Sequence, residues 1–233
     1  MNYAIIAAGE GSRLVQEGVR TPKPLIKINE VPLIGRLIYL FEKNGAESIS
    51  IIVNEEMTEV REYIKNLQLN VPLNIIIKST ESSMHSFFEL SKFLSGGKFC
   101  LTTVDTIFKE DEFAPYIQAF IEDNTCDGMM AVTDYIDDEK PLYVAVDEKK
   151  MTITDFLDTT SGKEKYISGG IYCLTPKSIA TLNNCLSAGI SRMRNFQRQL
   201  ITDGLNLKAY PFKKIVDVDH VGDIEKAEAF LNE

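Results

Sequence analysis

The chain has 233 residues, of which 44% are hydrophobic and 25% charged, and its formal net charge at pH 7 is -9. This length supports one substantial hydrophobic core, so we expect a single domain over residues 1–233. The acidic balance argues against nucleic acid as a partner, because a surface that binds DNA or RNA needs a surplus of basic side chains. It leaves room for a small phosphorylated ligand, since one phosphate site needs only a few local cations and backbone N–H groups.

The sequence also bears on cellular location. No apolar run approaches the roughly 20 residues that cross a bilayer, and the first residues lack the basic start of an export signal. The cysteines at 100, 126, 173 and 185 form no CxxC pair or Cys/His cluster, which is typical of reduced thiols. We therefore expect a cytoplasmic protein with no membrane partner.

The first half of the chain alternates short apolar runs with amphipathic stretches. Tyr3–Ala8 ends in a glycine-rich turn, as a strand buried on both faces of a parallel sheet does. A leucine stripe after Pro32 predicts a helix that ends at Asn44-Gly45. This alternation indicates βαβ units and a mainly parallel sheet. The further expected elements are strands at Ser48–Val53, Leu73–Lys78 and Phe99–Val104 and helices at Met57–Leu67 and Ser83–Leu94.

The alternation of strands and helices stops at about residue 127, where three strand candidates follow one another with little helix between them. We expect antiparallel additions to the sheet in this region. Helices and strands then alternate again toward the end of the chain. The expected strands are Gly128–Tyr135, Leu142–Asp147, Tyr166–Leu174, Leu207–Pro211 and Ile215–Val218, and the expected helices are Pro176–Leu186, Arg192–Thr202 and Ile224–Leu231.

A glycine-rich loop follows the first strand, with the sequence AAGEGSRL over residues 7–14 and then PKPL over residues 22–25. Gly9 and Gly11 let the backbone turn its N–H groups toward an anion, and small alanines leave room for a base and a ribose. The loop lacks the third glycine of a dinucleotide fingerprint, because Leu14 stands there, and it lacks the GK[ST] ending of a P-loop. Arg13 and Lys23 add positive charge.

The combined string closely resembles the signature of the sugar-phosphate nucleotidyltransferases, in which AAGxGxRL is followed by PKPL and then by PLI before a helix. The resemblance implies an α/β, Rossmann-like three-layer sandwich of the nucleotide-diphospho-sugar transferase type, with a mixed, mainly parallel sheet. It implies a nucleotide-binding half over residues 1–110 and an acceptor-binding half over residues 111–233. The implied nucleotide-binding residues of the loop are Ala7, Ala8, Gly9, Gly11, Ser12, Arg13 and Lys23.

The implied reaction joins an NMP from an NTP to a phosphorylated acceptor and releases pyrophosphate. Negative charge builds on the leaving group and on the equatorial oxygens, so fixed cations lower the barrier. Arg13 and Lys23 are therefore predicted to be catalytic. Either residue without the surrounding motif would be interpreted as a solvated surface side chain.

Two carboxylates from different loops are predicted to hold Mg²⁺ together with phosphate oxygens. Asp105 follows an apolar strand and resembles the family's strand ending in DxxF. Asp217 lies in a segment that resembles the family's closing motif, and Asp219 competes with it for the metal-binding position. The alternatives are that Asp105 caps a turn and that Asp217 or Asp219 caps the last helix.

The loop over residues 79–86 corresponds to the family's base-reading loop but contains no glycine. It resembles, faintly, the loop of cytidylyltransferases that act on phosphocholine and related alcohol phosphates. Ser82 or Ser83 binds a base edge or caps the following helix, and the sequence does not decide between these roles. His85 is expected on a helix surface.

The acceptor site is expected near Gly169 and Gly170, because residues 169–172 resemble the family's GGIY strand. Glycines there either allow close approach of a sugar or mark a bulge. Lys165 or Lys163 is a candidate cation for the acceptor phosphate. The family's sugar-specific F-x-E-K-P motif is absent from the region of residues 155–158.

We thus predict a nucleotidyltransferase that uses Mg²⁺, an NTP and a small phosphorylated acceptor, with a sugar 1-phosphate preferred. One alternative is a cytidylyltransferase for an alcohol phosphate such as phosphocholine. A second is a glycosyltransferase of related fold, with Asp217-Val218-Asp219 as its DxD motif. A third is a non-catalytic module that senses a nucleotide or NDP-sugar. The base and the oligomeric state are left open.

Overall fold

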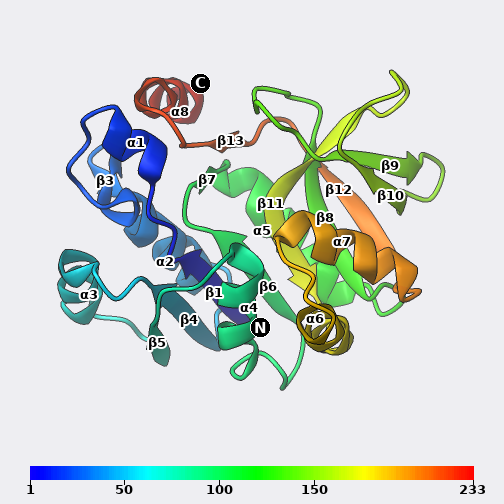
Figure 1. Ribbon diagram of the computed structural model, residues 1–233, viewed down its shortest axis with the longest axis horizontal. Coiled ribbons are helices and arrows are strands. Elements are labelled where there is room, and N and C mark those ends of the chain that lie inside the picture. The colour runs from blue at the N-terminus through cyan, green and yellow to red at the C-terminus, as the bar shows by residue number, and fades with distance from the viewer.

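The computed structural model describes residues 1–233 and is built on one mixed sheet of nine strands. The strand order is β5-β4-β1-β6-β11-β8-β12-β10-β9. Figure 1 shows this sheet crossing the molecule with helices packed along it. The strands are β1 (Asn2–Ala7), β4 (Ser48–Val53), β5 (Leu73–Ile77), β6 (Phe99–Thr103), β8 (Gly128–Thr133), β9 (Tyr143–Asp147), β10 (Thr152–Leu157), β11 (Tyr166–Leu174) and β12 (Leu207–Phe212).

Helices and two small ladders complete the fold. The helices are α1 (Ser12–Gln16), α2 (Leu33–Lys43), α3 (Thr58–Lys65), α4 (Ser83–Ser91), α5 (Glu110–Glu122), α6 (Lys177–Ser187), α7 (Met193–Thr202) and α8 (Val221–Asn232), with a 3₁₀ turn η1 (Lys23–Leu25). The small ladders pair β2 (Lys27–Ile28) with β3 (Val31–Pro32), and β7 (Thr106–Ile107) with β13 (Val216–Asp217). None of the helices combines the length and apolarity that crossing a membrane requires.

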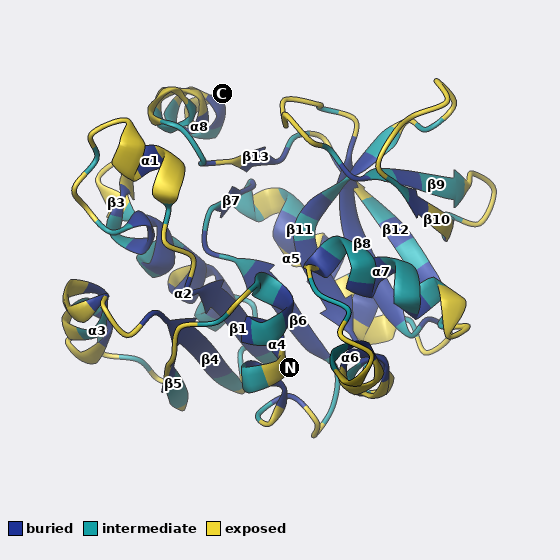
Figure 2. Cartoon of the chain, in the orientation of Figure 1, coloured by how far each residue is buried: buried dark blue, intermediate teal, exposed yellow.

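β1 lies inside the sheet and separates two hydrophobic cores. Its alternate side chains belong to different clusters, with Tyr3 and Ile5 in one and Ala4 and Ile6 in the other. A strand buried on both faces needs an uninterrupted apolar sequence, which explains why β1 shows no polar alternation. In Figure 2 this strand and its neighbours form the dark, buried centre of the molecule. α2 and α5 contribute to the first core, and α4, α6 and α7 contribute to the second.

The parallel part of the sheet agrees with the sequence prediction. β1 pairs in parallel with β4 and β6, and β4 pairs in parallel with β5. The expected antiparallel additions are also present, because β11 runs antiparallel to both β6 and β8. β12, however, returns parallel to β8. The strands of the first half therefore present their carboxyl ends along one edge, where ligands of such sheets bind.

The far end of the sheet departs from a plain three-layer sandwich. β9 pairs with β10 and also with β11, so β11, β8, β12, β10 and β9 close into a ring. The α/β class and the mixed sheet were predicted, but this closure was not. β10, with the sequence TITDFL, was not expected as a strand, although its β-branched residues favour one.

α5 is the largest element that the sequence interpretation missed. Its buried residues Phe113, Tyr116, Ile117 and Phe120 follow the spacing of an amphipathic helix, so the signal was present. Pro115 lies inside the helix, where a proline removes one backbone hydrogen bond. Packing of the apolar stripe against the first core outweighs that loss.

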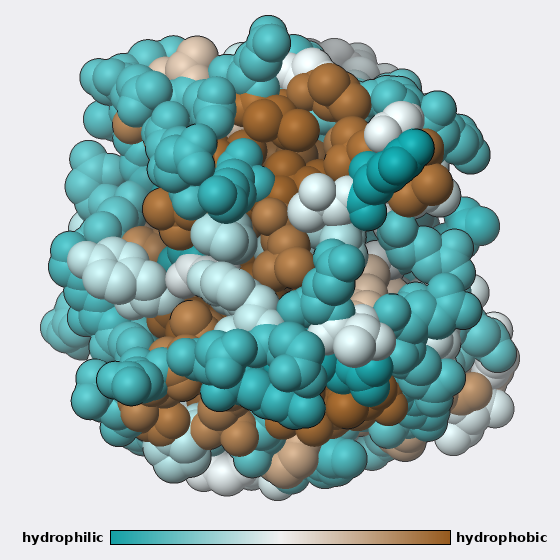
Figure 3. All heavy atoms as spheres, turned by 90° about the vertical axis from the view of Figure 1, so that its left-hand side faces the viewer, coloured by the Kyte–Doolittle hydropathy of each residue, from teal (hydrophilic) through white to brown (hydrophobic).

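The surface mixes polar and apolar side chains. Figure 3 shows the face that lies at the left of Figure 1, with hydrophobic atoms visible between hydrophilic ones. α1, β3 and α2, which are on that side in Figure 1, carry three exposed large apolar side chains, Val15, Val31 and Tyr39. Isolated side chains of this kind are ordinary on protein surfaces.

Candidate active site

Three cavities meet at the carboxyl ends of the parallel strands. The largest, about 660 Å³, is lined by the glycine-rich loop after β1 and by the segments after β4, β5 and β6; we call it the loop cavity. A second cavity of about 340 Å³ is lined by many carboxylates and is named the acidic cavity. A third of about 310 Å³ contains Arg192 and Arg194 and is named the arginine cavity. Asp219 lines the loop and acidic cavities, and Asp105 lines the loop and arginine cavities.

Lys23 lies at the centre of the loop cavity. Its Nζ donates to Asp105 Oδ2 at 2.5 Å and to Asp219 Oδ1 at 2.7 Å, and its side chain is only 8% exposed. Gly11 makes this approach possible: it has φ of 62°, and a Cβ there would lie 3.1 Å from Lys23 Cβ. The loop glycine is therefore required by both backbone conformation and packing.

Opposite charges hold this cluster in its ionised form. Burial alone would lower the pKa of Lys23, but Asp105 and Asp219 raise it well above the usual lysine range. Burial would likewise raise the pKa of Asp105, and the charge and hydrogen bond of Lys23 lower it. Arg13 Nη1 donates to Asp219 Oδ2 at 2.7 Å. The two cations of the loop and two of the three predicted acidic residues thus form one connected network.

Asp217 differs from its neighbours because no lysine or arginine pairs with it. It lies on β13 opposite Thr106 of β7 and opens onto the acidic and arginine cavities. Its side chain is exposed to these cavities, and their walls remove part of its hydration. This loss, followed by repulsion from Asp105, raises the pKa of Asp217 to about 7, while a hydrogen bond from Thr106 acts in the opposite direction.

Neither Asp217 nor Asp219 caps the last helix. The capping bonds of α8 come instead from Asp223, whose Oδ2 accepts from the backbone N–H groups of Asp219 at 3.1 Å and His220 at 2.8 Å. That alternative from the sequence is therefore wrong. Both aspartates keep their carboxylates in the cleft, and Asp223 fixes the backbone that carries Asp219.

Gly169 and Gly170 lie at a bulge in β11, where the register against β8 shifts between Ser168 and Tyr172. A Cβ on Gly169 would come within 2.3 Å of Ile215 Cδ1. Gly170 has φ of 73°, and a Cβ there would lie 2.9 Å from the Thr106 hydroxyl. The glycines serve the bulge and the packing of β7 and β13, and they also line the acidic and arginine cavities, respectively.

Ser82 and Ser83 line the loop cavity, and Ser83 also reaches the arginine cavity. Ser82 occupies the N-cap position of α4, but its side chain makes no capping bond. Its Oγ lies 2.9 Å from Nδ1 of His85, whose side chain is half-buried rather than on an open helix surface. The Ser82 hydroxyl therefore does not cap α4, and its contact with a base stays a prediction.

The structure places Lys165 outside the three cavities. Its ammonium lies 3.8 Å from Asp134 and over the ring of Tyr166. Lys163 is exposed and does not line the cavities either.

The cations that do line the arginine cavity are Lys140, Arg192 and Arg194, which the sequence interpretation missed. Arg194 is neutralised by Asp158 at 2.6 Å, whereas the Arg192 side chain forms no ion pair. Arg192 has φ of 73°, a conformation that disfavours residues other than glycine and often marks functional sites. The available signal was two arginines beginning a helix, where a positive charge is unfavourable.

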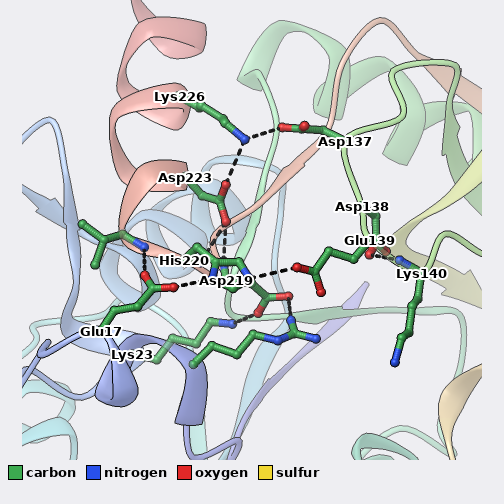
Figure 4. Close-up of polar contacts among 12 residues, drawn as sticks. Glu17, Lys23, Asp137, Asp138, Glu139, Lys140, Asp219, His220, Asp223 and Lys226 are labelled. Carbon is green, nitrogen blue, oxygen red and sulfur yellow. Dashed lines mark hydrogen bonds and ion pairs between the residues drawn. The ribbon is translucent and has the colours of Figure 1, made fainter.

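An ionic cluster ties α1, α8 and the segment after β8 together, and we call it the α8 clasp. Figure 4 shows Glu17 beside His220 and Lys226 between Asp137 and Asp223. Glu17 accepts from His220 Nδ1 at 2.5 Å and from the backbone N–H of Val221 at 2.7 Å. These bonds lower the pKa of Glu17. The clasp therefore joins α1, which carries Arg13, to the segment that carries Asp219.

A family model described as nucleotidyl transferase matches residues 3–233. The chain belongs to the nucleotidyl transferase family. It is therefore an enzyme of the nucleotidyltransferase class, and the family assignment decides against the glycosyltransferase and the non-catalytic module. The glycine-rich loop, the closing segment and all of β1 except Asn2 lie within the matched residues.

Individual relatives are distant and differ in their substrates. The D-glycero-alpha-D-manno-heptose 1-phosphate guanylyltransferase of Campylobacter jejuni is 26% identical over 176 residues, which cover 75% of this chain and 76% of the relative. The 2-aminoethylphosphonate cytidylyltransferase of Lancefieldella rimae is 27% identical over 114 residues, 47% of this chain and 45% of the relative.

Solved structures share the fold over the whole chain. The inositol-1-phosphate CTP transferase from T. maritima has a TM-score of 0.82 at 18% identity, covering 100% of this chain and 96% of the other. A UDP-glucose pyrophosphorylase complexed with UDP-glucose has a TM-score of 0.80 at 16% identity, covering 99% and 98%. The α/β fold of this chain is therefore shared with these structures.

Proposed function

We propose that this nucleotidyltransferase uses Mg²⁺ to join an NMP to a sugar 1-phosphate and release pyrophosphate. One observation carries the proposal. Lys23 and Arg13 from the glycine-rich loop meet Asp105, Asp217 and Asp219 from two distant segments at one cleft. Fixed cations and a carboxylate pair at the carboxyl ends of parallel strands are the groups that phosphoryl chemistry requires.

In the proposed reaction, an oxygen of the acceptor phosphate forms a bond to the α-phosphorus of the NTP. The bond from that phosphorus to the oxygen bridging toward the β-phosphorus breaks, and pyrophosphate leaves with the electron pair. Lys23 and Arg13 stabilise the charge that accumulates on the phosphate oxygens. The triphosphate competes with Asp219 for both cations, so NTP binding rearranges the ion pairs around Asp219.

The carboxylates fit a magnesium ion. Asp105 and Asp217 repel each other, and Asp217 lacks a cationic partner, so a divalent cation would relieve an existing repulsion. No group of three or more His, Cys, Asp or Glu residues forms a complete cage. This suits Mg²⁺, which takes one or two carboxylates together with phosphate oxygens and water. Bound there, the ion would neutralise charge on the phosphates. Asp219, already paired with Lys23 and Arg13, is the weaker candidate.

The arginine cavity is the proposed site of the acceptor phosphate. Asp105 and Asp217 both line it, and Arg192, whose guanidinium forms no ion pair, lines it together with Ser83. Arginine suits this task because its fork of N–H donors matches phosphate oxygens. Gly170 of the β11 bulge lines the same cavity. The guanylyltransferase relative acts on a heptose 1-phosphate, which supports a sugar.

The acidic cavity favours a second candidate function. Its carboxylates outnumber its cations, which are Arg13 and Lys226. Such a lining suits an acceptor that carries an ammonium group, as phosphocholine does, and a cytidylyltransferase for 2-aminoethylphosphonate is among the relatives. The acidic residues are Asp137, Asp138, Glu139, Asp217, Asp219 and Asp223.

The test is pyrophosphate release with Mg²⁺, each of the four NTPs in turn, and a panel of sugar 1-phosphates, phosphocholine and 2-aminoethylphosphonate. We expect turnover with one NTP and a sugar 1-phosphate, and none in excess EDTA. Turnover with an ammonium-bearing acceptor alone would replace the main proposal by the second. Equal turnover with and without EDTA would remove the role of the metal.

A cytoplasmic location is part of the same proposal. All four cysteines are free and buried, which suits a compartment where thiols stay reduced. Fractionation of cells that express the protein would test it, with recovery in the cytosolic fraction as the expected outcome.

A further inference from the structure

Asn54 is a buried polar side chain that the proposed chemistry leaves unused. It follows β4 directly, lines the loop cavity and is 7% exposed. Its Oδ1 accepts from the backbone N–H of Glu56 at 2.9 Å and from the Ser79 hydroxyl at 3.3 Å. Its Nδ2 makes no hydrogen bond to the protein.

The orientation of this amide is fixed by chemistry. A backbone N–H can only donate, so the atom of Asn54 that faces Glu56 must be the oxygen. The amide nitrogen, with two donor hydrogens, is then directed away from that contact. An unpaired donor in a buried side chain costs free energy unless a ligand or water accepts from it. The loop cavity offers the space for such an acceptor.

The position of Asn54 identifies which part of a nucleotide it would meet. β1 lies between β4 and β6 in the sheet, so Asn54, after β4, is two strands away from Asp105, after β6. Neighbouring strands are about 4.8 Å apart, which gives a separation on the order of 10 Å. With the phosphates at Lys23 and Asp105, a ribose occupies the space over β1, where Ala8 and Gly9 are small. The base then reaches Asn54.

We propose that the Asn54 amide donates a hydrogen bond to a carbonyl oxygen on the base of the bound NTP and thereby selects the base. This inference rests on the proposed function, since it places a nucleotide in the loop cavity. Asparagine can recognise adenine by donating one hydrogen bond to the base and accepting another from it. Here Oδ1 already accepts from Glu56 and Ser79, so it is not available to accept from adenine. The free donor therefore fits the carbonyl oxygen of cytosine, uracil or guanine, whereas adenine could meet it only through a ring nitrogen and would find no acceptor at Asn54 for its amino group.

The sharpest variant is Asn54→Asp. A carboxylate keeps an acceptor for Glu56 and Ser79, so the loop stays anchored, but it replaces the amide donor with a second acceptor. Asn54→Ala removes the donor without adding charge. The matched control is Asn74→Asp on β5, because Asn74 Nδ2 donates to Ser50 Oγ at 3.2 Å and Asn74 does not line the cavity.

Binding of CTP, GTP, UTP, ATP and inorganic tripolyphosphate is measured by calorimetry for the wild type and the three variants. We expect the wild type to bind one carbonyl-bearing NTP most tightly. Asn54→Asp and Asn54→Ala should each weaken that nucleotide at least tenfold relative to tripolyphosphate, and Asn74→Asp should leave the ratio unchanged. Tripolyphosphate affinity also reports whether each variant is folded around the phosphate site.

Two outcomes would overturn the inference: ATP as the tightest ligand of the wild type, or an unchanged ratio of NTP to tripolyphosphate affinity in both Asn54 variants. Neither depends on turnover. Absence of pyrophosphate release by the wild type would instead count against the proposed function, while a base-dependent affinity that is lost in the Asn54 variants would still support the contact.

Discussion

The nucleotide side and the acceptor side of the cleft are built in different ways. The loop cavity takes its key groups from strand ends and from the buried side chains of Lys23 and Asn54, which are 8% and 7% exposed. The arginine cavity takes its cations from the start of α7 and from Lys140 in the exposed segment after β8. Arg194 on α7 is 32% exposed, and its partner Asp158, which follows β10, is 55% exposed. Buried groups on strand ends are held rigidly, whereas exposed charges are screened and mobile. Substitutions should therefore affect turnover most on the nucleotide side and acceptor affinity most on the acceptor side.

The largest effect is expected at the buried ion pair. Lys23→Ala and Asp105→Asn should each lower kcat/KM by at least about a hundredfold, because each removes a charge close to the transferring phosphate. Pyrophosphate release gives the rate, and thermal unfolding shows whether the variant is folded. Lys23→Ala leaves Asp105 without a cationic partner, since Asp219 still pairs with Arg13, and should also lower the thermal midpoint, whereas Asp105→Asn keeps a hydrogen-bond acceptor for Lys23. A near-normal rate in both folded variants would contradict the site assignment.

Asp217→Asn should separate activity from stability. We expect a loss of turnover of about a hundredfold, with a higher thermal midpoint in EDTA at pH 8. The pKa of Asp217 is raised to about 7, so ionisation of this carboxyl costs folding free energy, increasingly from the ordinary aspartate range up to pH 7 and fully above it. The amide removes that cost. The stabilisation should therefore be smaller at pH 5 than at pH 8, and a destabilised variant at both pH values would contradict the electrostatic account.

Arg192 tests the acceptor side. Arg192→Gly should raise the KM for the acceptor about tenfold, the scale of a hydrogen bond to a charged group, and leave the KM for the NTP unchanged. Because glycine tolerates φ of 73°, this variant should also be about 1 kcal/mol more stable.

Arg192→Ala provides the matched comparison, since it loses the guanidinium but keeps the backbone strain. It should show the same change in KM without the stabilisation. If both variants instead raised the KM for the NTP, Arg192 would belong to the nucleotide side and the division of the cleft would be wrong.

The smallest effect is expected at the α8 clasp. Glu17→Gln weakens the contact with His220, so Arg13 should be held less firmly and the KM for the NTP should rise by a few fold. The exposed pair of Lys27 and Glu30 offers a control. Glu30→Gln removes only a surface ion pair, so it should change neither the stability nor the kinetics measurably. Equal kinetics in the Glu17 and Glu30 variants would show that the clasp does not position the loop.

The local sequence was sufficient to predict the N-terminal half of the fold and most of the nucleotide site. β1, β4 and β6 are continuous apolar runs because parallel strands are buried on both faces, and their loops follow in order. Gly11 and Lys23 were recognisable because a phosphate loop needs a specific backbone conformation within a few residues. The family resemblance rested on these residues and extends to residue 233.

The remaining features of the fold and of the site could be determined only from the tertiary structure, because they depend on contacts between residues far apart in the chain. The closure of β9 onto β11 pairs Val144 with Tyr166 and Tyr143 with Ile167, more than 20 residues apart in the chain. The roles of Asp217 and Asp219 differ through their neighbours, since Lys23 and Arg13 reach Asp219 and leave Asp217 unpaired. The same physical reason explains why Arg192 and Asn54 were missed. Their importance depends on the cavities that they line and on the hydrogen-bond or ion-pair partners that they lack. The adjacent sequence shows neither property.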